Sequence, residues 1–218
     1  SSVDIVKSYN MENLTLICES DKGIFDAMNK GIALSKGSWI IFMGVDDWFC
    51  DKDVLSFFAE KMRNTDVELI TGDIVFENGY RYSSVFARKI LFINSIHHQG
   101  AFYRGDIISG ELYNTDYTVS SDYELNLKMY LQGCKAISFK KDISFVGVSG
   151  VSSFGKMHGY LSEIRIRNKL IKNIPKKMFI NTVCFSRFLV RRIDKVLFRG
   201  FFLSLYKKII QYELKKEI

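Results

Sequence analysis

The feature that most constrains the fold is an uninterrupted apolar run, Trp39 to Met43, which lies between two segments with helical periodicity. Residues 21–37 precede it and residues 54–63 follow it, and both carry apolar residues at helical spacing. A short apolar run without alternation is typical of a strand that is buried on both faces. A strand between two helices predicts an α/β fold, because the helices must cover the faces of a sheet.

The rest of the chain up to residue 155 continues this alternation. A hairpin is expected around Asn78-Gly79, because both residues accept a positive φ. Further strands are expected at 14–19, 101–108 and 135–148, and further helices at 88–96 and 120–133. Residues 1–155 are therefore predicted to form an α/β/α sandwich with a mostly parallel central sheet.

Two adjacent carboxylates, Asp46 and Asp47, come just after the apolar run. Neighbouring carboxylates repel each other, and a divalent cation with a preference for oxygen ligands, Mg²⁺ or Mn²⁺, would remove that repulsion. Ligands of open α/β sheets bind beyond the carboxyl ends of the strands, where this pair is expected. A solvated Asp-Asp turn that caps the next helix explains the pair as well, so the pattern alone leaves both interpretations open.

Other polar groups stand at predicted element ends. His97, His98 and Gln99 precede the strand expected at 101–108, and they could contact a phosphate or a sugar hydroxyl. Together with Asp46 and Asp47 the histidines could also serve a metal-dependent phosphoesterase, although such enzymes usually need more ligands than the chain offers here. A zinc site is excluded for the same reason. A lone Asp122 in a first helical turn is explained by the helix dipole alone.

Several blocks occur in an order that resembles one known family. The stretch ESDKGIFDAMNKGIALSKGSWIIFMGVDDWF is similar to the central block of bacterial family 2 glycosyltransferases, and HHQGAFYR, SDYEL and GVSGVSS are similar to later blocks of that family. The resemblance covers residues 1–155. The subgroup it most resembles builds exopolysaccharide, colanic-acid-type or O-antigen chains. It implies a GT-A fold, a nucleotide-sugar donor, a saccharide or lipid-linked acceptor and a divalent metal.

The resemblance also assigns roles to residues. Asp46 and Asp47 would hold the metal and the donor diphosphate, and Asp122 would be the general base that deprotonates the acceptor hydroxyl. His98 and Gln99 would lie beside the donor phosphates and the acceptor. The residues expected to shape the nucleotide pocket are Asp21, Lys22, Gly23 and Asn29. One metal site and one separate base suit a single displacement with inversion at the anomeric carbon.

Two departures from the family pattern qualify this expectation. The family often carries an acidic residue or Asn two positions before Asp46, where this chain has Gly44. The segment SSVDIVKSY matches the stretch after the family's second strand, so the N-terminal strand and the aspartate that reads the base are expected to be missing. A non-catalytic remnant of a GT-A fold that binds no donor is therefore the alternative to an inverting transferase.

The charge divides the chain in two. Residues 1–155 carry 15 lysines and arginines against 20 aspartates and glutamates, whereas residues 156–218 carry 16 against 4. Within this C-terminal extension, residues 186–213 read as a basic amphipathic helix, which suits an anionic membrane surface or, equally, a helix pair packed on the core. Nucleic acid is not expected as a partner, because the core is acidic and has no reader motif.

Four scattered cysteines without paired spacing indicate reduced thiols. We therefore expect a cytoplasmic protein, peripheral at the inner face of the plasma membrane.

Overall fold

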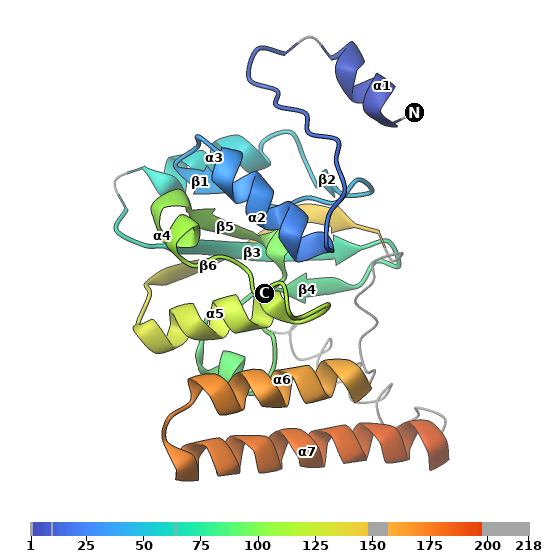
Figure 1. The fold of residues 1–218 in the computed structure, drawn as a ribbon, viewed down its shortest axis with the longest axis vertical. Coiled ribbons are helices and arrows are strands. Elements are labelled where there is room, and N and C mark those ends of the chain that lie inside the picture. The colour runs from blue at the N-terminus through green and yellow to red at the C-terminus, as the bar shows by residue number, and fades with distance from the viewer. Residues whose placement is uncertain (1, 10, 64, 148–156, 198–218) are drawn as a thin grey trace.

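The computed structural model describes residues 2–9, 11–63, 65–147 and 157–197 (Figure 1). The N-terminal half contains α1 (Ser2–Ser8), α2 (Ile24–Leu34), β1 (Trp39–Ile40), β2 (Trp48–Phe49), α3 (Val54–Met62), β3 (Leu69–Phe76), β4 (Arg81–Ser83), and the 3-10 turns η1 (Arg88–Leu91) and η2 (His98–Gly100). The C-terminal half contains β5 (Ala101–Arg104), α4 (Gly105–Gly110), α5 (Ser121–Gln132), β6 (Ala136–Val146), α6 (Met157–Leu170) and α7 (Ile174–Leu197).

The strands form one sheet in the order β1-β5-β3-β6-β2, and β4 pairs with the second half of β3. Among these pairs only β3 and β6 are parallel. The prediction of a mostly parallel sheet is therefore wrong, although β1, β3 and β6 do point the same way. The chain travels from β3 to β5 through a hairpin and two 3-10 turns, without the long helical crossover that a parallel neighbour requires.

The two faces of the sheet are covered by different helices. Successive residues of β3 point to opposite faces, so that Leu69 joins a cluster with α2, α4 and α5 while Ile70 joins a cluster with α3. Leu69, Ile70 and Phe58 are fully or almost fully buried. The predicted α/β/α sandwich is thus confirmed as an arrangement of layers.

The prediction for several elements needs correction. Residues 14–19 are not a strand: Leu14, Leu16 and Ile17 are exposed. The strand expected at 101–108 turns into α4 after Arg104, and the expected helix at 88–96 is reduced to η1.

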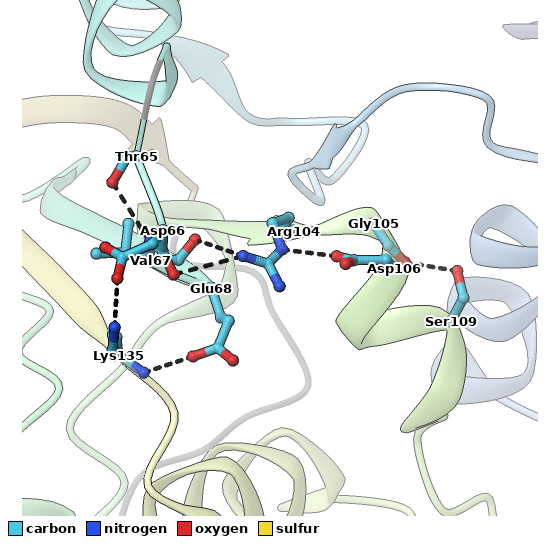
Figure 2. A network of polar contacts seen from close by, with 9 residues as sticks. All are labelled: Thr65, Asp66, Val67, Glu68, Arg104, Gly105, Asp106, Ser109 and Lys135. Carbon is cyan, nitrogen blue, oxygen red and sulfur yellow. Dashed lines mark hydrogen bonds and ion pairs between the residues drawn. The ribbon is translucent and has the colours of Figure 1, made fainter.

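Arg104 joins three elements at the edge of the sheet where β3 and β6 begin (Figure 2). Its guanidinium donates to the Asp106 carboxylate at 2.7 Å and to the Val67 carbonyl at 3.4 Å. Close by, the Lys135 backbone N–H donates to the Glu68 carboxylate at 2.6 Å, and the Lys135 ammonium pairs with Asp66. These exposed pairs lie at the edge of the sheet opposite the candidate site, and each contributes little to stability.

The described part of the C-terminal extension is a helix pair packed beyond α5 (Figure 1). Ile166 and Ile171 belong to the same hydrophobic cluster as α2 and α5, as do Ile180 and Cys184 of α7. The boundary predicted at residue 155 therefore separates segments of different charge that share one core. Among the described helices, none is both long and apolar enough to cross a membrane.

Candidate active site

The candidate site lies at the edge of the sheet where β1, β3 and β6 end and β2 and β5 begin. The register places Trp48 opposite Phe145 and Val75 beside Phe145, so Asp47, at the start of β2, lies near the last residues of β6. Trp48 and Phe145 stack with ring centroids 4.4 Å apart. Gln99 lies at the same edge, just before β5. Its backbone carbonyl accepts a hydrogen bond from the Ser144 hydroxyl at 2.7 Å.

Asp46 and Asp47 form a tight turn around two glycines. The Asp47 carboxylate accepts the backbone N–H of Gly44 at 2.5 Å, and a Cβ at Gly44 would lie 2.8 Å from that carboxylate. A Cβ at Gly147, which follows β6, would lie 2.4 Å from Asp46 Oδ2. In this turn the Asp47 carboxylate occupies the space beside Gly44, so a larger residue at that position would require the Asp46 and Asp47 side chains to shift.

Gln99 and the two histidines extend this group. The Gln99 amide donates to Asp47 Oδ2 at 3.1 Å, which brings together two residues predicted from the sequence to act on the donor. The imidazoles of His97 and His98 stack with centroids 5.4 Å apart. Both Nδ1 atoms and Gln99 Oε1 are buried and have no hydrogen-bond partner among the described residues. Burial separates these three atoms from solvent, and the Gln99 side chain also acts on His97 by raising its pKa.

Burial keeps the histidine pair neutral near pH 7. It lowers the pKa of His98 to about 4 and also lowers the pKa of His97. The negative charges of Asp122 and, to a smaller degree, Asp47 raise the pKa of both histidines, but the effect of burial is larger. Both carboxylates therefore lie near enough to the two rings to act on them electrostatically. A neutral imidazole in that place can donate one hydrogen bond to a phosphate or hydroxyl oxygen.

Asp122 is held at the start of α5 by two hydrogen bonds. Its Oδ1 accepts the backbone N–H of Tyr123 at 2.8 Å, and its Oδ2 accepts the side-chain amide of Asn94 at 2.8 Å. The residue before the helix, Ser120, has a φ of 75°, which is unusual for a residue with a side chain. Sequence reasoning missed Asn94, since it lies 28 residues from Asp122 and belongs to no recognisable motif.

The residues predicted to shape the nucleotide pocket gather around Lys30 and Tyr113. The Lys30 ammonium pairs with Asp21 at 2.7 Å, and the Lys22 backbone N–H donates to Asp26 at 2.9 Å. Gly23 precedes α2 with a φ of 130°, which favours glycine. The Asn29 amide exchanges two hydrogen bonds with the Tyr113 backbone, at 2.8 and 2.9 Å. Asn29 therefore joins α2 to the segment that leads into α5, and its role in donor binding stays a prediction.

A divalent metal fits the carboxylate turn only in part. The oxygens of Asp46 and Asp47 are the ligand type that Mg²⁺ and Mn²⁺ prefer. However, no group of three or more His, Cys, Asp or Glu side chains in the described ranges is arranged to hold a metal. Any metal there would need further oxygen ligands, from water, carbonyl groups or a bound diphosphate, to complete its coordination.

Two sequence predictions fall largely outside the described residues. Of the segment GVSGVSS only Gly147 is described, and of the basic segment 186–213 only residues up to 197 are described. Within that part, Arg187 is half-buried, whereas Arg191 and Arg192 are exposed.

Solved structures and characterised relatives can now be compared with this geometry. The structure is similar to residues 1–349 of TarS from S. aureus in complex with UDP, with a TM-score of 0.61 and 18% identity over 93% of this chain. It is similar to the UDP-GlcNAc complex of the same protein, with a TM-score of 0.61 and 14% identity. The chain spans 62% and 63% of those two structures. At this identity the likeness shows the fold alone.

The sequence comparisons are more specific. The chain is 27% identical over 194 residues to "PGL/p-HBAD biosynthesis glycosyltransferase" proteins of Mycobacterium bovis and Mycobacterium tuberculosis, which covers 87% of this chain and 72% of each relative. The sequence profile described as "Glycosyl transferase family 2" matches residues 1–140. Since that match covers well over half of the chain, the protein belongs to glycosyl transferase family 2, and the family and the GT-A class of fold expected from the sequence are confirmed.

Proposed function

We propose that the protein transfers a sugar, with inversion, from a nucleotide-diphospho-sugar to a hydroxyl of a saccharide or lipid-linked acceptor in cell-surface polysaccharide biosynthesis. The observation that carries this proposal is a pair of anchored carboxylates: Asp47 accepts the Gln99 amide at 3.1 Å, and Asp122 accepts the Asn94 amide at 2.8 Å. Family membership supports the reaction, and the UDP and UDP-GlcNAc complexes of the structural neighbour support the class of donor. The phosphoesterase alternative has no comparable support.

Each group has a distinct chemical task in this proposal. The acceptor oxygen forms a bond to the anomeric carbon while the bond from that carbon to the diphosphate oxygen breaks. Asp122 takes the proton from the acceptor hydroxyl, and Asn94 fixes the direction of its carboxylate. His98 and Gln99 donate hydrogen bonds to phosphate oxygens. Bound Mg²⁺ or Mn²⁺ beside Asp46 and Asp47 would supply positive charge for the departing diphosphate.

The test combines turnover with donor binding. Nucleotide-sugars with different bases and sugars are incubated with the chain, Mn²⁺ and a hydroxyl-bearing acceptor, and release of the nucleoside diphosphate is measured. Asp122→Asn should lower transfer at least about 100-fold, because it removes the base, while the donor Kd stays the same. Asp116→Asn is the matched control, since this carboxylate lies in the exposed loop before α5, and it should leave transfer unchanged.

The outcomes separate the two candidate functions. Full transfer by Asp122→Asn would remove Asp122 as the base. A chain that releases no diphosphate, and that shows no metal-dependent heat with UDP in calorimetry, would instead be the non-catalytic alternative.

A further inference from the structure

Helix α7 presents a largely apolar face to solvent, which only Thr182 and Ser186 interrupt. Seven large apolar side chains of this helix are between 39% and 65% exposed: Ile174, Met178, Phe179, Phe185, Leu189, Val190 and Ile193. We name this set the α7 ridge. Positions 174, 178, 185, 189 and 193 recur at helical spacing and share one face, with 179 and 190 beside them. Large contiguous apolar patches of this kind mark binding surfaces.

The opposite face of α7 packs against the rest of the protein. Ile180 and Cys184 are buried in the main hydrophobic cluster, and the Cys184 thiol contacts the Phe92 carbonyl at 3.2 Å. Phe188 stacks on Tyr160 of α6 with centroids 4.6 Å apart. Figure 1 shows α7 as the outermost helix, beyond α6 and α5. The α7 ridge is therefore not needed to attach the helix to the fold.

The basic residues beside the α7 ridge favour an anionic partner. Helix α7 carries Lys176, Lys177, Arg187, Arg191, Arg192 and Lys195, and its one acidic residue is the buried Asp194. Helical geometry places Lys177 and Arg192 along one edge of the ridge and Lys176 and Arg187 along the other. A second copy packed ridge to ridge would bring these like charges together. The phosphates of an anionic bilayer would neutralise them, and the ridge, about 29 Å long, would lie in the boundary between headgroups and acyl chains.

We propose that the α7 ridge is the surface by which the protein binds an anionic membrane. The membrane-binding surface thus begins at Ile174, before the segment 186–213 expected from the sequence. Its main contacts with the membrane are apolar rather than basic. The proposal deepens the proposed function, because it identifies the phase from which a lipid-linked acceptor would reach Asp122. It rests on that function for its biological purpose only, since membrane binding needs neither donor nor acceptor.

The experiment is co-sedimentation of the whole chain with vesicles. Vesicles of equimolar phosphatidylcholine and phosphatidylglycerol should bind the protein at least tenfold more tightly than vesicles of phosphatidylcholine alone, and added salt should weaken the binding. The ridge variant Phe185→Gln with Leu189→Gln should lose at least tenfold in affinity without any change in net charge. The matched control is Leu112→Gln with Leu131→Gln, which removes two exposed leucines elsewhere and should bind like the wild type.

Three results would overturn the proposal: no vesicle binding by the wild type, equal loss in the ridge and control variants, or a ridge-dependent dimer in ultracentrifugation that does not bind vesicles. Circular dichroism of each variant checks that the helices persist. Asp122→Asn should bind vesicles like the wild type, so that failure of membrane binding and failure of sugar transfer remain distinguishable.

Discussion

At the scale of single residues, the position of the Asp122 carboxylate depends on Asn94. The Asn94 amide donates to Asp122 Oδ2 at 2.8 Å. A hydrogen bond to a charged group contributes about 1.5–3 kcal/mol, so Asn94→Ala should lower kcat roughly 10- to 100-fold. KM for the donor should stay unchanged, because Asn94 is expected to act on the acceptor side. Steady-state kinetics with a donor that the wild type uses give both constants.

The control for Asn94 is Asn168→Ala, which removes an exposed amide of α6 whose Oδ1 accepts a hydrogen bond from Asn181 of α7 at 2.9 Å, away from Asp122 in the hydrogen-bond network. It should leave both constants unchanged. A purely structural role for Asn94 would lower the free energy of unfolding and leave kcat of the folded fraction intact, and that result would contradict the positioning role.

Residue chemistry also decides how much of the site the sequence could predict. Asp46, Asp47 and Asp122 stand at the ends of elements with strong local patterns, so they could be selected in advance. Asn94 could not, since its contact with Asp122 depends on how separate segments meet. The crowding of Gly44 likewise follows from the fold of the turn, where the Asp47 carboxylate occupies the space of a side chain.

At the scale of elements, helices were more predictable than strands for a physical reason. The expected helices at 21–37, 54–63 and 120–133 match α2, α3 and α5, because periodicity and end signals are local. The directions of the strands depend on non-local pairing. Thus β5 inserts antiparallel between β1 and β3, which no local pattern of its residues indicates.

The contact between α5, α6 and α7 depends on the fully buried Arg167. Its guanidinium donates to Glu163 at 3.2 Å, to Tyr123 Oη at 3.3 Å and to Asn181 at 3.1 Å. Removing one partner of a buried ion pair typically costs about 3–5 kcal/mol. Arg167→Met should therefore lower the free energy of unfolding in urea by about 3 kcal/mol, because Glu163 is partly exposed and can recover some hydration.

Arg165→Met is the matched control for this prediction, because Arg165 lies on the same helix and is exposed. It should change the free energy of unfolding by less than about 0.5 kcal/mol. Equal effects of the two substitutions would show that Arg167 does not hold the three helices together.

At the scale of the whole molecule, the acidic core and the described part of the basic extension share one hydrophobic cluster, to which Ile166, Ile171 and Ile180 belong together with residues of α2 and α5. We therefore expect them to unfold as one cooperative unit. Charge patterning divides the chain by composition but did not reveal this shared core. Apolar contacts of the inward faces of α6 and α7 unite them together with the buried Arg167, whereas Arg165, Arg191 and Arg192 are exposed. Unfolding should therefore report on the whole described fold, including the candidate site.

If the fold unfolds as one unit, the protonation of His98 contributes to the free energy of unfolding of the whole protein. Burial lowers its pKa from 6.5 to about 4, so the unfolded chain binds the proton more readily than the folded one between these values. The contribution of His98 is complete above pH 6.5 and is lost as the pH falls towards 4. At pH 5 the wild type should be less stable than at pH 7 by about 2 kcal/mol from this residue alone.

His98→Gln keeps a polar side chain of similar size without a titrating group, so its unfolding free energy in urea should fall less between pH 7 and pH 5. The difference between the two proteins cancels the contributions of the carboxylates, and identical pH dependence in both would mean that His98 is not held neutral by the fold.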